Sequence, residues 1–305
     1  MNKKYSVGMI VLLLTSFICI STFAKTVQVI NLSDIDTVTL KSYGNLFITQ
    51  GDKNTLWVET VKANLHNIKV INKNRQLVIK SIDQSSSWLD SINLFKSPYE
   101  LNFYLIVKNL EFIDLDGSGN ITIDREMKLN KLNIDLNGSG DFNAIIIKTD
   151  NFSININGSG VLNINSILSN NFSQFKVAGS GDLNIASISD AKINIVISGS
   201  GNVNLKKVKT EDIDSEIIGS GKINVAGIAD TQKVSIIGSG NYYGKSLKSN
   251  KSDLYSTGGG NITVSSENFV SVNKLGSGDM NIYGKPKINS FNVEGSGSVH
   301  FHNLK

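Results

Sequence analysis

Apolar and polar residues alternate in short runs that recur about every 20 residues through the last two thirds of the chain. Each run follows a Gly-Ser-Gly tripeptide, replaced once by Gly-Gly-Gly at Gly258. Counted from the last glycine, the second and fourth residues are mostly apolar and the third is polar, as in Leu162-Asn163-Ile164. Because successive side chains of a strand point to opposite faces, this alternation predicts a strand with one buried face.

A second run of the same kind precedes each tripeptide, with Leu136, Ile156 and Val177 at the equivalent apolar position of three successive repeats. Each repeat therefore predicts two strands of about six residues. Glycine at the corner between them supplies either a positive φ or room for a close turn, and we expect Gly160 to hold a positive φ. The tripeptides open at intervals of 18 to 21 residues, a period typical of solenoids.

An antiparallel meander would also turn at the glycines, but it would not stack equivalent residues in columns. The shared phase of the repeats favours an all-β fold, a right-handed parallel β-solenoid (β-helix) of about ten coils of about 20 residues each. We expect aliphatic residues such as Ile164, Ile185 and Leu205 to lie one above another inside it.

Residues 25–110 lack the tripeptide but carry strand signals of their own. These signals lie at residues 38–40, 46–48, 56–59, 68–71 and 77–82. Because the terminal units of a solenoid must close its ends, we expect an N-terminal β cap region over residues 25–110. Within it, residues 83–100 are rich in serine and predict a long surface loop. The Gly-Ser-Gly repeat solenoid would follow over residues 111–305.

The first 24 residues have the pattern of a secretory signal peptide. Lys3 and Lys4 precede an apolar run from Val7 to Ile20, and small residues end the segment. The only cysteine, Cys19, lies in this segment, so the mature chain has no disulfide. The expected location is extracytoplasmic, either periplasmic or secreted to the cell surface.

Charge and hydropathy exclude several classes of partner. The formal net charge of +4 falls to +2 when the two lysines of the leader are removed, and acidic and basic residues are interspersed. No basic stripe indicates nucleic-acid binding. After residue 24 no apolar run is long enough for a transmembrane helix.

The mature chain resembles one known family over essentially its whole length. Residues 43–52, Tyr-Gly-Asn-Leu-Phe-Ile-Thr-Gln-Gly-Asp, and the strand through Leu77 to Ile79 are similar to the opening of the head GIN domain of auto-transporter adhesins. Residues 105–121, which end in Asp-Gly-Ser-Gly-Asn-Ile, resemble that family's entry into its repeats. The resemblance implies a β-solenoid in a bacterial extracytoplasmic protein, and it brings no catalytic residues with it.

Two polar columns follow from the repeat. The outward asparagines are Asn143, Asn163, Asn184, Asn204, Asn224 and Asn281. We interpret them mainly as a structural ladder of stacked amides, with binding of sugar hydroxyls as the alternative. The serines of the tripeptides are interpreted as architectural, because small hydroxyls fit a tight corner and can bond neighbouring backbone. They are Ser118, Ser139, Ser159, Ser180, Ser200, Ser220, Ser239, Ser277 and Ser296.

Three coils near the C-terminus break the pattern. Tyr242-Tyr243-Gly244 replaces the usual triplet, Gly259 replaces serine, and Ser256 and Lys274 stand at normally apolar positions. We interpret this mainly as a weakened end of the solenoid, with ligand binding as the alternative, because function often accompanies broken local rules, and the ligand-binding candidates are therefore on this part of the rod. They are Tyr243, Tyr283, His300 and Asn281, which should face outward on one sheet, where aromatic rings can stack on sugars.

The predicted function is a non-enzymatic display surface for a glycan or another cell-surface ligand. One alternative is a polysaccharide-active hydrolase or lyase using Asp114 and Asp135, which fall at equivalent positions of consecutive coils. Another is a structural envelope protein that binds other proteins. No cofactor is expected, and no metal, since His300 and His302 on one strand face do not make a zinc site.

Overall fold

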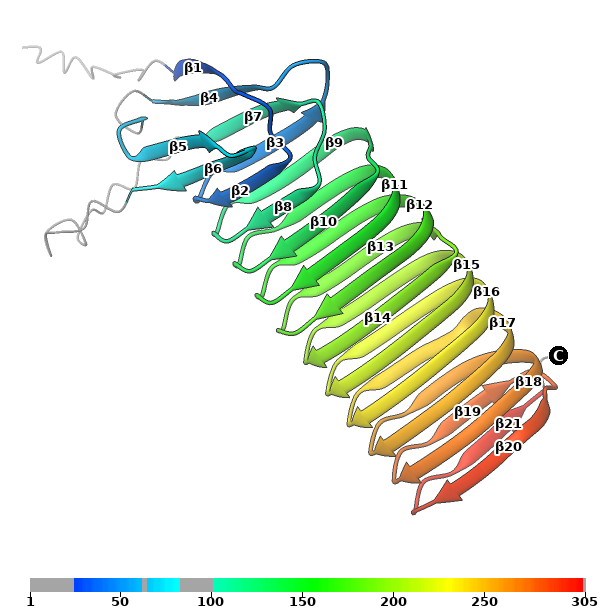
Figure 1. The fold of residues 1–305 in the computed structure, drawn as a ribbon. Coiled ribbons are helices and arrows are strands. Elements are labelled where there is room, and N and C mark those ends of the chain that lie inside the picture. Colours follow the sequence, from blue (N-terminus) through cyan, green and yellow to red (C-terminus); the bar gives the residue numbers. More distant parts are fainter. Residues whose placement is uncertain (1–24, 62–64, 83–100, 304–305) are drawn as a thin grey trace, which may run out of the picture.

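The fold consists of β-strands stacked across the axis of a rod (Figure 1). This computed structural model describes residues 25–61, 65–82 and 101–303, so the predicted signal peptide and the predicted loop 83–100 lie outside the described residues. The rod is a β-solenoid of about ten turns, as the sequence predicts. Its two faces are called here the first sheet, which contains the strand after each tripeptide, and the second sheet, which contains the strand before it.

Strands of the repeats pair in parallel and in the predicted phase. The register joins Ile164 to Ile185 and Ile185 to Leu205, so the expected aliphatic columns are confirmed. All three side chains are buried. The strands of this part are β8 (Phe112–Leu115), β9 (Asn120–Lys128), β10 (Lys131–Leu136), β11 (Phe142–Ile156), β12 (Val161–Val177), β13 (Asp182–Ser189), β14 (Lys192–Gly199), β15 (Asn202–Gly219), β16 (Lys222–Gly238), β17 (Asn241–Gly258), β18 (Ile262–Gly276), β19 (Met280–Tyr283), β20 (Lys287–Glu294) and β21 (Val299–His302).

The prediction of two short strands per coil is wrong for six coils. In β11, β12, β15, β16, β17 and β18 one strand of 15 to 18 residues runs through both sheets. The tripeptide forms one corner of each coil. The other corner turns by shifts of register, such as the one between Thr149 and Asn151, and the ladder continues around it.

The glycine corners are governed by close approach and not, in the early coils, by positive φ. Gly160 does not have the positive φ that we expected, but a Cβ atom on it would lie 2.0 Å from the carbonyl oxygen of Gly140 in the coil before. The first glycine of the tripeptide does take a positive φ in later coils, beginning at Gly219. Stacked corners therefore leave no room for a side chain at the last glycine.

The N-terminal strands extend both sheets and end them differently from the repeats. They are β1 (Lys25–Asn31), β2 (Thr37–Lys41), β3 (Asn45–Gln50), β4 (Thr55–Val61), β5 (Ile68–Lys73), β6 (Gln76–Ser81) and β7 (Asn102–Val107). In the first sheet β9 pairs in parallel with β3 and β3 with β7, after which β4 and β1 add antiparallel. In the second sheet β8 pairs in parallel with β2 and β2 with β6, after which β5 adds antiparallel. The parallel ladders thus reach beyond the glycine repeats, while the role of residues 25–110 as a cap stays a prediction.

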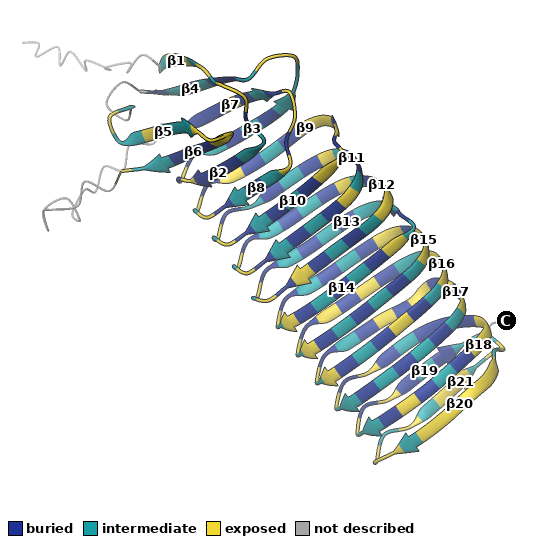
Figure 2. Ribbon diagram, in the orientation of Figure 1, coloured by how far each residue is buried: buried dark blue, intermediate teal, exposed yellow. Residues whose placement is uncertain are grey.

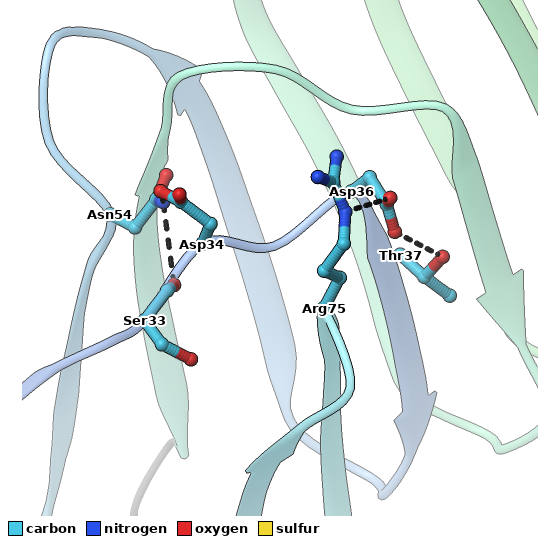
Figure 3. Close-up of polar contacts among 6 residues, drawn as sticks. All are labelled: Ser33, Asp34, Asp36, Thr37, Asn54 and Arg75. Carbon is cyan, nitrogen blue, oxygen red and sulfur yellow. Dashed lines mark hydrogen bonds and ion pairs between the residues drawn. The ribbon is translucent and has the colours of Figure 1, made fainter.

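One aspartate attaches the β5–β6 hairpin to the stack (Figure 3). Asn74 and Arg75 form its turn, both with positive φ, as in the two-residue turns that suit hairpins. Arg75 Nε lies 2.6 Å from Asp36 Oδ2, and Thr37 Oγ1 donates to the other oxygen at 2.9 Å. The backbone N–H groups of Asp36 and Thr37 also donate to the Arg75 carbonyl. The start of β2 and the hairpin are therefore held together by side chain and backbone.

The core is a column of mainly apolar side chains between the two sheets. It runs from Ile35 to Ile282, and inward positions appear as buried bands along the rod (Figure 2). Outward positions are half-buried or exposed, which is the alternation seen in the sequence. The core therefore leaves the outer faces of both sheets as long surfaces for binding.

Candidate functional site

A ladder of hydrogen-bonded amides runs along the outer face of the first sheet. The amide column consists of Asn143, Asn163, Asn184, Asn204 and Asn224. From Asn163 onward, each Nδ2 donates to the Oδ1 of the asparagine in the preceding coil, at distances of 2.7 to 3.1 Å. The predicted structural role of these asparagines is therefore confirmed.

The ladder does not use all the hydrogen-bonding capacity of its amides. An amide has two N–H donors and two acceptor lone pairs, and a ladder bond on each side uses one of each. Each inner member, such as Asn184, therefore keeps one donor and one acceptor for a ligand. A hydroxyl group, which both donates and accepts, complements such a row.

The surface beside the amide column is hollowed into a groove. One hollow of about 370 Å³ is lined by Asn143, Asn163 and Asn184, and a second of about 630 Å³ by Asn204 and Asn224 among others. Both hollows include Asn184 and Lys206, so they form one groove that crosses the coils. We call it the first-sheet groove.

The predicted ligand residues lie at the C-terminal end of this face. Tyr243 follows Asn224 in the register, lines the groove and is 45% exposed. Thr263, Asn281 and His300 continue the same column through the next coils. The structure thus brings Tyr243, Asn281 and His300 into one line.

Tyr283 lies beside that line and is already engaged. Its ring stacks on His302 with centroids 4.6 Å apart, and Lys245 Nζ lies 4.1 Å from its centre. His302 Nε2 is 2.8 Å from Asn281 Oδ1. These contacts hold Tyr283 in place, whereas the Tyr243 ring stays open to a ligand.

Sequence reasoning missed an aromatic cluster at the other end of the same column. Phe47 pairs with Thr122, Tyr104 with Phe47, and Trp57 with Tyr104, so they extend the line of Asn143 toward the N-terminus. The rings of Phe47 and Tyr104 stack with centroids 5.2 Å apart, and all three line a hollow of about 300 Å³. The available signal was an aromatic residue in two predicted strands, Phe47 in residues 46–48 and Trp57 in residues 56–59, whereas no strand was predicted at Tyr104.

The tyrosine-rich triplet of the irregular coils is largely a core feature. Tyr242 is fully buried, and a Cβ atom on Gly244 would lie 2.5 Å from its ring. The hydroxyl donates to Gln232 Oε1 at 3.3 Å, while Gln232 Nε2 donates to the hydroxyls of Ser249 and Ser252. Burial raises the pKa of the Tyr242 phenol well above its ordinary value. Glycine at position 244 thus makes room for the ring.

The two other polar substitutions of these coils are also buried. Ser256 and Lys274 continue the core column of Ile236 and are 2% and 1% exposed. Ser256 donates to the carbonyl of Gly260, and Lys274 Nζ to that of Gly276 at 2.8 Å. The polar groups of Ser256 and Lys274 therefore find their hydrogen-bond partners inside the rod. Of the triplet, only Tyr243 has its ring at the surface.

The second sheet has a hollow of its own, with a different chemistry. It measures about 570 Å³ and includes Asp214, Asp253 and Tyr255. Asp214 lies 3.3 Å from Lys192 Nζ, and Asp253 lies 2.8 Å from Lys251 Nζ. This face carries paired charges, whereas amides are the commonest polar groups of the first-sheet groove, which also includes Asp124, Lys206 and Lys245.

Asp114 and Asp135 are neighbours in register, as the sequence predicts. Asn137 Nδ2 donates to Asp114 at 3.0 Å, and Asn155 Nδ2 donates to Asp135 at 2.7 Å. Burial raises the pKa of Asp114, an effect that the bond from Asn137 opposes and the charge of Asp116 reinforces. Both carboxylates act as acceptors in side-chain ladders of the second sheet.

The serines of the tripeptides lie exposed at the glycine corners. Among the described residues, none of their hydroxyls makes a side-chain hydrogen bond, so the expected bonds to neighbouring backbone are not formed. The same described part of the chain contains no group of three His, Cys, Asp or Glu side chains placed to hold a metal ion. Nor does it contain a helix long and apolar enough to cross a membrane.

Comparison with known proteins identifies one family. The sequence model described as "Putative auto-transporter adhesin, head GIN domain" matches residues 34–169 and again residues 166–286. No curated protein matches the chain.

Several solved structures are similar over most of their length. A putative lipid binding protein from Parabacteroides distasonis is 19% identical, with a TM-score of 0.47, and the match covers 92% of this chain and 97% of that one. A putative adhesin from Parabacteroides merdae is 15% identical, with a TM-score of 0.46 and coverages of 93% and 98%. One from Bacteroides fragilis is 17% identical, with a TM-score of 0.33 and coverages of 92% and 97%. TM-scores below 0.5 give these structures no weight for function.

Proposed function

Because this chain belongs to the head GIN domain family of auto-transporter adhesins, we propose that it is an adhesin-like protein that binds a glycan along the first-sheet groove. The observation that carries the proposal is the single column of outward residues that crosses the coils. It begins with the rings of Trp57, Tyr104 and Phe47, continues through the amide column, and reaches Tyr243.

The chemistry of this column suits a neutral, hydroxyl-rich polymer. The free donor and acceptor of each inner amide complement sugar hydroxyls, and the aromatic faces at both ends complement the apolar faces of sugar rings. Coils repeat at about 4.8 Å along the axis, so an extended glycan lying across the strands would meet the same chemistry at each step. The second sheet, with its ion pairs, offers less to a neutral ligand.

We further propose that the protein binds without cleaving its ligand. Asp114 and Asp135 already accept bonds from Asn137 and Asn155, and they lie on the sheet opposite the groove. Assaying the purified protein for release of reducing ends from the glycan it binds tests this. Turnover that is lost in both Asp114→Asn and Asp135→Asn would instead support the hydrolase.

The location that we propose is outside the cytoplasm, because residues 1–24 have the pattern of a secretory leader. Cell fractionation with an antibody against the rod tests it. Recovery of a shortened chain in the periplasmic or surface fraction supports the proposal, and recovery of the full-length chain in the cytoplasm contradicts it.

Glycan-array binding by the wild-type protein and by two tyrosine variants tests the groove. Tyr243→Ala removes the open ring from the first sheet, and Tyr255→Ala is the matched control in the next half-coil on the second sheet. We expect Tyr243→Ala to weaken binding about fivefold or more through lost stacking, with Tyr255→Ala close to wild type. Equal effects of the two variants, or no glycan bound by the wild type, would refute the proposal.

A further inference from the structure

The last coil leaves its core uncovered. Ile288, Phe291 and Phe301 are 53%, 52% and 43% exposed. In the register they continue the buried columns of Val270, Val272 and Ile282. Figure 2 shows β20 as an exposed strand at this end of the rod. Inward-facing core residues of the last described coil thus meet solvent.

The backbone of the last coil is also unpaired on its outer side. Within the described residues, β20 pairs only with β18 and β21 only with β19. The opposite end differs, because antiparallel strands β4, β1 and β5 are added outside the parallel ladders there. The C-terminal end therefore offers both an apolar surface and open strand edges, which favour addition of another strand.

The sequence of β20 is complementary to itself when read antiparallel. A bulge leaves Asn289 out of the ladder, because Val270 pairs with Ile288 and Ser271 with Ser290. With that residue omitted, Phe291 is the centre of the strand. A second antiparallel β20 would then place Lys287 opposite Glu294 and Ile288 opposite Val293.

In each of these pairs, both side chains also point to the same face of the sheet. Ile288, Phe291 and Val293 continue inward columns, whereas Lys287 and Glu294 are exposed and make no ion pair within the described residues. The antiparallel register therefore places apolar residues over apolar residues and joins two lysine–glutamate pairs by symmetry.

The two strands of the last coil share one possible symmetry axis. The rings of Phe291 and Phe301 face each other across the core, with centroids 6.3 Å apart. An axis through both would place Phe291 opposite its own copy and Phe301 opposite its own copy. The same rotation thus pairs β20 with β20 and β21 with β21.

From this geometry we propose that two copies of the chain associate through their C-terminal ends, with the last coils paired antiparallel about a two-fold axis. The interface buries the core residues left exposed by the last coil and continues both sheets from one copy into the other. It does not depend on what the first-sheet groove binds.

Charge reversal tests the register. Sedimentation velocity of the secreted chain over a range of concentrations should show a monomer–dimer equilibrium. Lys287→Glu and Glu294→Lys should each weaken dimerisation about tenfold or more, because each places like charges opposite one another twice. The double variant should return the dissociation constant close to its original value. Lys248→Glu, an exposed position on β17, is the control and should change nothing.

A cysteine at the proposed axis gives a second readout. The chain has no cysteine besides Cys19 in the predicted leader, so Phe291→Cys introduces a single thiol that would lie opposite its copy. Mild oxidation should link Phe291→Cys into covalent dimers and leave Tyr243→Cys monomeric. A wild-type protein that is monomeric at every soluble concentration overturns the proposal. So does a dimer that the charge reversals leave intact, or one whose Phe291→Cys variant fails to cross-link.

Discussion

At the scale of single residues, the positions of the tripeptide differ in how much room they leave for a side chain. The last glycine of each corner lies against the carbonyl of the coil before it, and at Gly160 an added Cβ would come within 2.0 Å of that oxygen. The middle position is open, as Gly259 shows: there an added Cβ meets nothing closer than 3.7 Å. The repeat therefore requires glycine at its edges, while the middle position accepts serine.

The first prediction compares these two glycines. Gly160→Ala should lower the free energy of unfolding by about 2 to 4 kcal/mol, because the stacked corner must move apart to admit the methyl group. Gly259→Ala should change it by less than about 0.5 kcal/mol. Thermal or denaturant unfolding of both variants measures the difference. Equal losses would mean that the corner is not packed as described.

The second prediction follows from the raised pKa of Asp114. Burial raises this pKa above its ordinary value of 3.8, so the folded protein binds the proton more tightly than the unfolded chain does. The ionised carboxylate therefore costs stability at neutral pH, and this cost disappears as the pH falls through the raised pKa toward 3.8.

Asp114→Asn should accordingly stabilise the protein at pH 7 by a few tenths of a kcal/mol, a small gain because solvent screens this half-exposed group. The gain should vanish near pH 4. Urea unfolding at the two pH values measures it, and a gain of the same size at both would show that charge is not its cause.

At the scale of one strand, β17 combines a larger core residue at one position with a smaller residue two positions later. Its Tyr242 replaces the aliphatic residue of other coils, and Gly244 gives up a side chain to admit the ring. The hydroxyl donates to Gln232, whose side-chain amide donates in turn to Ser249 and Ser252. The tyrosine at position 242 can therefore be explained only together with the glycine at 244 and the polar residues around Gln232.

The third prediction is an energetic coupling between these two positions. Gly244→Val alone should destabilise the protein by about 1 to 3 kcal/mol, because its side chain overlaps the ring of Tyr242. In a Tyr242→Ile background the same substitution should cost far less, since that pair restores the pattern of Ile223 and Val225. Unfolding of the four proteins in a double-mutant cycle measures the coupling. Additive effects would contradict the described packing.

The repeat explains which parts of the strands could be predicted. Ile164 and Ile185 share a phase fixed by the tripeptides, so their stacking and the outward ladder of Asn163 and Asn184 follow from periodicity alone. The merging of strands at the second corner could not be predicted in a coil such as β11, because that strand contains no glycine or proline and its turn is made by a register shift.

Contacts distant in sequence explain what was missed. The hydrogen bond of the buried Tyr242 could not be predicted, because its partner Gln232 lies in another coil. At the N-terminus β6 pairs with β2 and β7 pairs with β3, although β6 and β7 come later in the chain. They therefore lie nearer the N-terminal end of the rod than β2 and β3 do. Without that order, Trp57 and Tyr104 could not be placed on the same line as Asn143 and Tyr243. Of the candidate site, the C-terminal half was therefore predicted and the N-terminal half was not.

At the scale of the whole molecule, the direction of the backbone hydrogen bonds has a mechanical consequence. The strands lie across the rod, so the bonds that join coils run along its axis (Figure 1). The first and last described strands, β1 and β21, are at opposite ends. Tension applied through the two ends therefore loads these bonds in series and peels one coil at a time, unlike shear, which would load all the bonds of a strand together.

The fourth prediction concerns the behaviour of the rod under pulling. A coil contains about 20 residues, and unravelling it should release about 65 Å of extended chain. Single-molecule stretching should give a series of low, similar force peaks at about that spacing, with the longest lengths reached stepwise. One high peak followed by complete extension would contradict this. A rod that lengthens stepwise under load limits the peak force along its axis. A ligand bound in the first-sheet groove would therefore experience a smaller force than one bound to a rigid rod.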